Sequence, residues 1–354
     1  MKKFILFTLL FLSPFIVFYL PYFIGDPFKV LRHYENYYPE DGGPLWFNNN
    51  RTYVSTMIYV QNKNKYKWNS FIFGSSRSGY YRIEHWKHYI GEDSRCFHFD
   101  GYGESLYNMY RKLKFIDGKS EIRNALFCID EMTLSQDQAE TGHLWIPAPA
   151  LEDNKNWPQF HMAAIKAYSK WDFIRTYIDF SLNHKVKPYM IERGIIDTVP
   201  HGDYDISTNE CGTTLPLPYR YEYDSAFYTE KKKGQFFDRP DTTQYVKPIL
   251  KSHHVQILTD MKEILEKNHT NYQFVINPVY DQKKLSNKDM IILEDLFGEH
   301  LFDFSGRNLL TQDYRNYSDV SHFRQHVAAE VMRIMYEKDD ERRSQMMDSL
   351  YNVK

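Results

Sequence analysis

Short apolar runs alternate with amphipathic segments in two stretches of the chain, and this alternation is the strongest pattern in the sequence. The first stretch contains the apolar runs SFIFG, CFHF and ALFCI, and helical spacing of apolar residues lies between them. The second stretch contains the runs YQFVINPV and HLFDF, again between segments with helical spacing. Strands that alternate with helices pair in parallel through crossover helices, so we predict an α/β fold with a central, mostly parallel sheet.

Between these two stretches, the alternation breaks. We place the core of the domain in residues 68–135 and 243–337, with a helix from about Thr243 to Asn268, and treat residues 136–242 as an insertion. The insertion contains a proline-rich segment, one helical run from about His161 to Asn183, and a long irregular segment rich in Tyr, Gly and Asp. Loops of this length are usually functional, so we expect a lid or a partner surface.

The two ends of the chain differ from the domain between them. Residues 26–67 are rich in turn formers, as in YYPEDGGPLWFNNN, and we predict an irregular segment there. Residues 338–354 are strongly charged, which predicts a solvated tail or a frayed helix. The α/β domain is therefore expected to occupy residues 68–337.

The N-terminus predicts a membrane anchor in residues 1–25. The stretch from Phe4 to Gly25 has no charged residue, and about 20 apolar residues are enough to cross a bilayer. Two lysines precede the stretch, which places the short tail in the cytoplasm and the main domain outside it. No small-residue cleavage site follows, so we favour an uncleaved anchor at the cell membrane; the alternative is a signal peptide with a long apolar region.

Composition excludes several classes of protein. The formal net charge of −2 gives no field that would attract nucleic acid. The three cysteines form neither a disulfide framework nor a CxxC site, and we predict no metal and no cofactor. Aromatic residues make up 17% of the chain, and tyrosine-rich surfaces are typical of contacts with sugars, although a biased genome gives the same composition.

Ser76 is the first candidate for chemistry. It follows the apolar run FIFG, and ligands of parallel α/β sheets bind at the carboxyl ends of the strands. Gly74 permits a tight turn before it, and the start of a helix supplies free backbone N–H groups. A serine in this place is either a nucleophile or a simple helix cap.

Two further motifs supply the other groups that a serine nucleophile needs. Asp319 and His322 lie three residues apart at the start of the last helix, so the carboxylate could hold the imidazole of a general base, or simply cap that helix. Gly101 and Gly103 follow the second apolar run, where a backbone N–H could face an oxyanion; the alternative is an ordinary turn.

Taken together, the blocks FGSSRS, DGYGES, FDFSG and NYSDVSHFR make the sequence resemble the SGNH (GDSL-like) hydrolase superfamily. It is most similar to the membrane-anchored DltD- and AlgJ-type branch of bacterial envelope polysaccharide proteins. The resemblance covers about residues 68–135 and 243–337, and implies a three-layer, flavodoxin-like sandwich. It also implies Ser76 as nucleophile, Asp319 and His322 as its partners, and Gly101 or Gly103 as oxyanion donor.

The sequence departs from that family at two positions. Ser75 stands where an aspartate usually precedes the nucleophile, as in the DltD-like branch. The third block lacks its asparagine, and Asp130 and Glu131 follow the third apolar run instead. A carboxylate there would repel an oxyanion unless it is protonated or turned away. We expect Arg77 and Arg324 to bind an anionic substrate or balance Asp130, or to form surface ion pairs.

The sequence thus leaves three functions open. The first is an esterase or O-acyltransferase that acts on an envelope polysaccharide or a lipid-linked glycan, with acyl groups supplied by a membrane-bound O-acyltransferase partner, as the resemblance implies. The second is a non-catalytic glycan-binding or scaffold subunit of the same fold. The third is an anchor subunit whose insertion recruits a partner.

Overall fold

A computed structural model gives the fold and describes residues 1–202, 204–211, 228 and 233–352. Its centre is a sheet of five strands, and each neighbouring pair is parallel. In order across the sheet the strands are β11 (Leu301–Asp303), β9 (Asn271–Ile276), β4 (Asn124–Ile129), β2 (Ser70–Gly74) and β3 (Cys96–His98). The α/β prediction with a central parallel sheet is confirmed, and all five predicted apolar runs form its strands.

The chain enters the sheet near its middle and winds in both directions. From β2 it crosses to the edge strand β3, and then returns past β2 to β4, β9 and β11. The direction therefore reverses between β2 and β4. In doubly wound sheets of this order, the carboxyl ends of the two strands at the reversal flank the ligand site.

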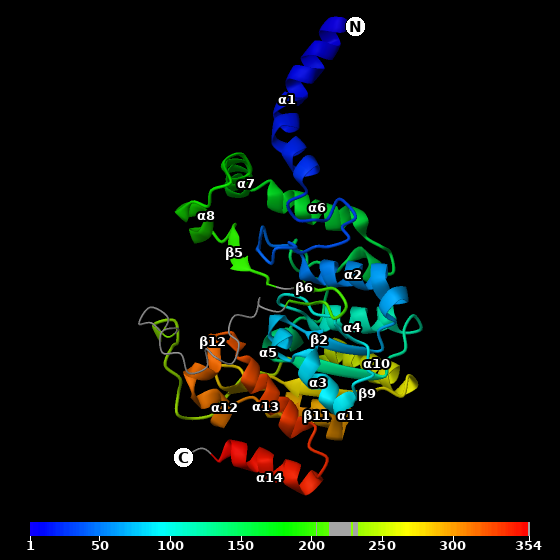
Figure 1. Cartoon of the computed structure of the whole chain (residues 1–354), viewed down its shortest axis with the longest axis vertical. Coiled ribbons are helices and arrows are strands. Elements are labelled where there is room, and N and C mark those ends of the chain that lie inside the picture. The colour runs from blue at the N-terminus through cyan, green and yellow to red at the C-terminus, as the bar shows by residue number, and fades with distance from the viewer. Residues whose placement is uncertain (203, 212–227, 229–232, 353–354) are drawn as a thin grey trace.

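Helices cover both faces of the sheet (Figure 1). Phe71, Phe73 and Phe127 point to one face, whereas Ile72 and Leu126 point to the other, as the alternation along a strand requires. The first face is covered by α2 (Arg51–Tyr66), α4 (Leu106–Ile116), α10 (Ser252–Lys267) and α11 (Asn287–Phe297). The second is covered by α3 (Ile83–Ile90), α13 (Gln325–Met335) and α14 (Asp340–Tyr351).

Helix α2 corrects the prediction that residues 26–67 are irregular throughout. Asn50, one of the asparagines that suggested a turn, caps this helix. Its side chain accepts a hydrogen bond of 2.9 Å from the Tyr53 N–H. Val54 and Ile58 then pack into the core. The turn formers in this segment therefore mark the start of a core helix.

Two other helices differ from their predicted bounds. The predicted helix at 161–183 is two helices, α6 (Trp157–Tyr168) and α7 (Trp171–Asn183). The helix predicted from Thr243 begins only at Ser252, because Pro248 cannot continue a helix. The residues before it include β8 (Gln244–Tyr245), which pairs in parallel with β10 (Lys283–Lys284).

The described part of the insertion packs against the N-terminal segment. Strand β1 (Pro44–Trp46) pairs with β5 (Asp197–Pro200), and the ring of Phe47 contacts those of Phe173 and Tyr177 on α7. The short helix α8 (Pro188–Glu192) and the hairpin of β6 (Tyr204–Asp205) and β7 (Glu210–Cys211) complete this layer. Most of the irregular segment predicted after it, residues 212–227 and 229–232, lies outside the described residues.

The C-terminal segment is a docked helix rather than a solvated tail. Leu350 of α14 is buried in the cluster on the second face, and the Tyr351 hydroxyl donates to the carbonyls of Asp303 and Ser305 at 2.8 and 2.9 Å. At the other end, α1 (Lys2–Gly25) is helical and leads away from the body (Figure 1). Over the part of the chain that the structure describes, no helix satisfies the length and hydropathy of a membrane span.

Candidate active site

Ser76 lies where the sheet ends and a short helix begins. Strand β2 is fully buried, and η1 (Ser76–Tyr80) follows it directly, with the Ser75 hydroxyl accepting from the Arg77 N–H at 3.4 Å. A Cβ on Gly74 would lie 2.6 Å from the Cβ of Ser78 and 2.9 Å from that of Cys128. Glycine is therefore required at this point because β4 and η1 approach so closely.

Asp319 and His322 lie on a tight hairpin, and this corrects their predicted place at the start of a helix. The hairpin pairs β12 (Tyr317–Asp319) with β13 (His322–Phe323), and α13 begins only at Gln325. One carboxylate oxygen of Asp319 accepts the backbone N–H groups of Ser321 and His322 at 2.7 and 3.0 Å. The turn therefore fixes the carboxylate next to the histidine.

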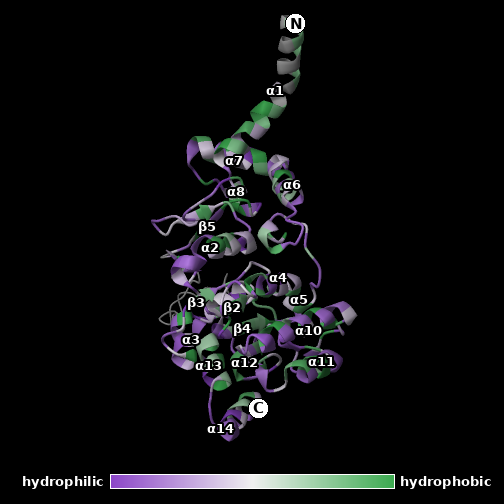
Figure 2. Cartoon of the chain, turned by 90° about the vertical axis from the view of Figure 1, so that its right-hand side faces the viewer, coloured by the Kyte–Doolittle hydropathy of each residue, from purple (hydrophilic) through white to green (hydrophobic). Residues whose placement is uncertain are grey.

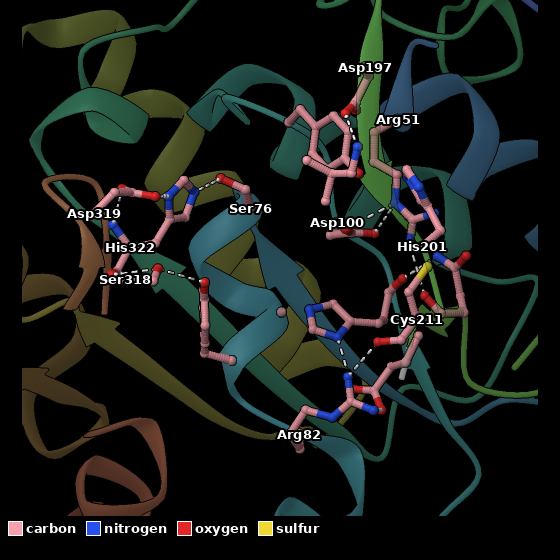
Figure 3. Close-up of a pocket in the computed structure, with 17 residues that line it drawn as sticks. Arg51, Ser76, Arg82, Asp100, Asp197, His201, Cys211, Ser318, Asp319 and His322 are labelled. Atoms are coloured by element: carbon pink, nitrogen blue, oxygen red, sulfur yellow. Dashed lines mark hydrogen bonds and ion pairs between the residues drawn. The ribbon is translucent and has the colours of Figure 1, made fainter. Parts of the chain in front are cut away.

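The hairpin and η1 meet at the carboxyl edge of the sheet (Figure 3). Ser76 Oγ lies 2.8 Å from His322 Nε2, and His322 Nδ1 lies 3.0 Å from both carboxylate oxygens of Asp319. Because a carboxylate only accepts hydrogen bonds, Nδ1 carries a proton and Nε2 is free to accept the one on Ser76. This is the geometry of a serine, histidine and aspartate triad.

Comparison with known proteins gives no family for this chain. No model of a protein family matches the sequence, and a search of curated proteins finds no significant match. The function must therefore be argued from the geometry of the site.

Arg77 holds the hairpin against the sheet and does not enter the cavity in front of Ser76. Its Nε donates to the Ser321 carbonyl at 2.7 Å, and its Nη1 donates to Asp130 at 2.7 Å. Asp130 also caps the short helix α5 (Glu131–Leu134) through the Thr133 N–H. The carboxylate expected to repel an oxyanion is thus neutralised by Arg77, and it lines a different cavity together with Glu131.

Of the two predicted oxyanion donors, Gly101 has its N–H bonded within the sheet, and Gly103 is absent from the walls of the cavity that Ser76 lines. The Gly101 N–H donates to the Gly74 carbonyl at 3.1 Å, because the ladder between β2 and β3 continues past the last residue of β3. A Cβ on Gly101 would lie 2.4 Å from Thr52 Oγ1, so this glycine permits close packing against α2. Gly103 has a φ of +57° and lies against Trp145, which explains its presence without a role in chemistry.

Arg324 is buried behind the hairpin instead of facing a substrate. Its Nε donates to the Tyr228 hydroxyl at 2.8 Å, and its guanidinium lies over the Tyr228 ring. It is absent from the walls of the cavity that Ser76 lines. The prediction that Arg77 and Arg324 bind an anionic substrate therefore has no support in the described contacts.

A cavity of about 320 Å³ opens in front of Ser76, and sequence reasoning missed most of its walls. Across the cavity from the triad, Arg51 pairs with Asp100 at 3.0 Å and Arg82 pairs with Glu210 at 3.2 Å (Figure 3). Glu210 comes from the insertion, and Arg51 from the helix that the sequence did not predict. Of these four wall residues, only Asp100 could have been found from the sequence. It follows the apolar run CFHF and precedes Gly101, just as Ser76 comes after the run FIFG.

The cavity walls carry two arginines and four carboxylates. Burial by itself would lower the pKa of Arg51, but Asp100 beside it raises that pKa above the ordinary value, so Arg51 stays charged. Burial raises the pKa of Tyr80 to about 12, so its hydroxyl stays protonated. Burial also lowers the pKa of His201, which therefore lines the cavity as a neutral ring. Because carboxylates outnumber arginines on these walls, the lining does not favour an anionic ligand.

Among the residues described, no cluster of three or more histidine, cysteine or acidic side chains is arranged to hold a metal. Cys96 and Cys128 are buried and Cys211 is partly exposed. His254 of α10 pairs with Asp137 at 3.3 Å.

Proposed function

We propose that this protein is a serine acyl-ester hydrolase or O-acyltransferase. One observation supports this above all: Ser76 Oγ, the His322 ring and the Asp319 carboxylate are joined at 2.8 and 3.0 Å at the rim of a cavity. The first pair spans 246 positions of sequence, so no local turn or cap accounts for it. Serine hydrolases use this constellation for nucleophilic catalysis on many folds.

In the proposed reaction, Ser76 Oγ attacks the ester carbonyl while its proton moves to His322 Nε2. The imidazolium is stabilised by Asp319, and the tetrahedral oxyanion accepts the backbone N–H of Ser76. The C–O bond to the leaving alcohol then breaks, and that alcohol takes the proton from Nε2. Water or a sugar hydroxyl next attacks the acyl-serine and gives its proton to Nε2. The bond between the acyl carbon and Ser76 Oγ then breaks, Oγ takes the proton back from Nε2, and an acid or a new ester is released.

The substrate and location are part of the same proposal. The cavity, whose walls carry more carboxylates than arginines, and the tyrosine-rich composition support a glycan substrate. The apolar N-terminus supports a membrane-anchored domain outside the cytoplasm, and the resemblance to DltD- and AlgJ-type proteins supports acyl transfer with a membrane-bound O-acyltransferase partner. An envelope polysaccharide or lipid-linked glycan is the substrate class that fits these features.

A second function, a non-catalytic glycan-binding or scaffold subunit, is favoured by one observation. The Gly101 N–H is already bonded to Gly74, and Asp130 occupies the place of the family's asparagine, so two expected oxyanion donors are missing. A protein of this kind would keep the fold and the cavity without forming an acyl-enzyme.

A fluorophosphonate probe distinguishes the two functions, because it reacts only with an activated serine. We expect the full-length protein to be labelled at Ser76, and expect Ser76→Ala to abolish the labelling. Ser135→Ala is the matched control, since Ser135 is an exposed serine directly after α5 whose hydroxyl donates to the Met132 carbonyl.

The contrary result is equally clear. If the folded wild-type protein is not labelled, or if Ser76→Ala is labelled as well as wild type, Ser76 is not a nucleophile. The non-catalytic subunit would then be the better account of the cavity.

A further inference from the structure

Helix α1 is docked firmly on the layer formed by α6 and α7. The Tyr168 hydroxyl donates to the Phe18 carbonyl at 2.9 Å, and the hydroxyls of Tyr19 and Ser169 lie 2.8 Å apart. A Cβ on Gly25 would lie 1.7 Å from the Tyr177 hydroxyl, so the glycine permits this approach. The last turns of α1 and the helix α7 therefore keep one relative position.

A large apolar surface is exposed around this junction. On α1, Phe15, Val17 and Ile24 are each more than half exposed. The ring of Trp171, at the start of α7, meets Phe18 edge-on with centroids 6.5 Å apart and is still 64% exposed. Figure 2 shows α7 beside the lower end of α1, with hydrophobic residues on both helices. Contiguous exposed apolar patches of this kind mark interaction sites.

Helix α7 has a second apolar face that points away from the protein. Trp171 and Leu182 are eleven residues apart, which brings both to one side of a helix, and they are 64% and 77% exposed. The opposite side supplies the buried contacts, Ile174, Tyr177 and Phe180. A helix in water needs only one apolar face, so the outward face calls for a partner.

The charges around this face identify the partner. Residues 156–195, which contain α6, α7 and α8, include six basic and three acidic side chains, although the whole chain has a net charge of −2. Lys170 directly precedes Trp171, and Lys185 follows the end of α7. Basic residues beside an exposed tryptophan and leucine are typical of a helix at the surface of an anionic bilayer.

We propose that α7 lies in the headgroup region of an anionic membrane, parallel to its surface, beside the point where α1 enters the lipid. Trp171 and Leu182 would reach the boundary between headgroups and acyl chains, where tryptophan is enriched in membrane proteins. The body of the protein would then rest on the membrane in a fixed orientation instead of swinging on a tether. This inference rests on the proposed membrane anchor, but it does not depend on the chemistry of Ser76.

Fluorescence quenching in vesicles tests the proposal. The full-length protein is reconstituted into vesicles of phosphatidylcholine and phosphatidylglycerol whose acyl chains are brominated near the headgroup. We expect quenching of the wild type, and expect Trp171→Phe to lose the largest share of it. Trp145→Phe is the control, because Trp145 is also exposed, to 41%, but its ring lies against Gly103 and Gly142.

Leu182→Asp gives a second test at a position exposed enough to leave folding unchanged. It should reduce the quenching of Trp171 at least twofold, as should vesicles of phosphatidylcholine alone. Quenching of Trp171→Phe equal to that of the wild type would overturn the proposal. Quenching that Leu182→Asp leaves unchanged would also overturn it. So would burial of Trp171 by a second copy of the chain in the absence of lipid.

Discussion

At the scale of single residues, the ion pair of Arg77 and Asp130 helps to fix the hairpin that carries His322 next to Ser76. Both side chains are almost fully buried, and Arg77 also bonds the Ser321 carbonyl on the hairpin that carries His322. Removal of one partner from such a pair leaves a buried charge without compensation, which costs about 3–5 kcal/mol. The pair therefore connects the stability of the domain to the geometry of its site.

We accordingly predict that Arg77→Met lowers the free energy of unfolding by about 3–5 kcal/mol, as measured by urea denaturation. The double variant with Asp130→Asn should recover most of this loss, because the amide carries no charge and still caps α5. A loss by Arg77→Met that is no greater than that of an exposed arginine, such as Arg342→Met, would contradict this role.

Residue types predicted the triad, whereas backbone contacts decided the rest of the site. The three triad side chains, those of Ser76, Asp319 and His322, suit one reaction. The sequence also places each of them at the boundary of a predicted strand or helix. The role expected of Gly101 failed because its N–H pairs with Gly74, and the register of a strand cannot be read from one sequence. Arg51 could not be foreseen either, since its helix was taken for an irregular segment.

At the scale of elements, periodicity predicted the five strands and most helices that cover them. The misses share a cause: polar residues near a boundary were read as loops. Asn50 is the cap of α2, and the charges on α14 face solvent while Leu350 faces the core. A helix that presents only a few apolar side chains to its neighbours gives too weak a periodic signal to be recognised.

The docking of α14 leads to a second prediction. Leu350→Ala should lower the free energy of unfolding by roughly 2–4 kcal/mol, because it leaves a cavity in the cluster on the second face of the sheet. Ser349→Ala, at the exposed neighbouring position, should change it by less than about 0.5 kcal/mol. Equal effects in thermal or urea unfolding would mean that α14 is the solvated tail that its composition suggested.

At the scale of the whole molecule, the sheet brings together segments that are far apart in the chain. The reversal between β2 and β4 places Arg77 and Asp130 side by side, and Arg77 also bonds the hairpin of residues 317–323. Helix α2 and the insertion add the opposite wall of the cavity. The sequence predicted the first arrangement through the order of its strands, but the insertion has no periodic pattern from which its position could be inferred.

The central claim is that His322 activates Ser76 across this assembled site, and the rate of Ser76 labelling tests it most directly. The second-order rate constant for a fluorophosphonate at Ser76 is measured by mass spectrometry for wild type and His322→Ala. Loss of the general base should lower this constant by about 10²–10⁴-fold while the fold is retained. Labelling of His322→Ala at the wild-type rate would contradict the account.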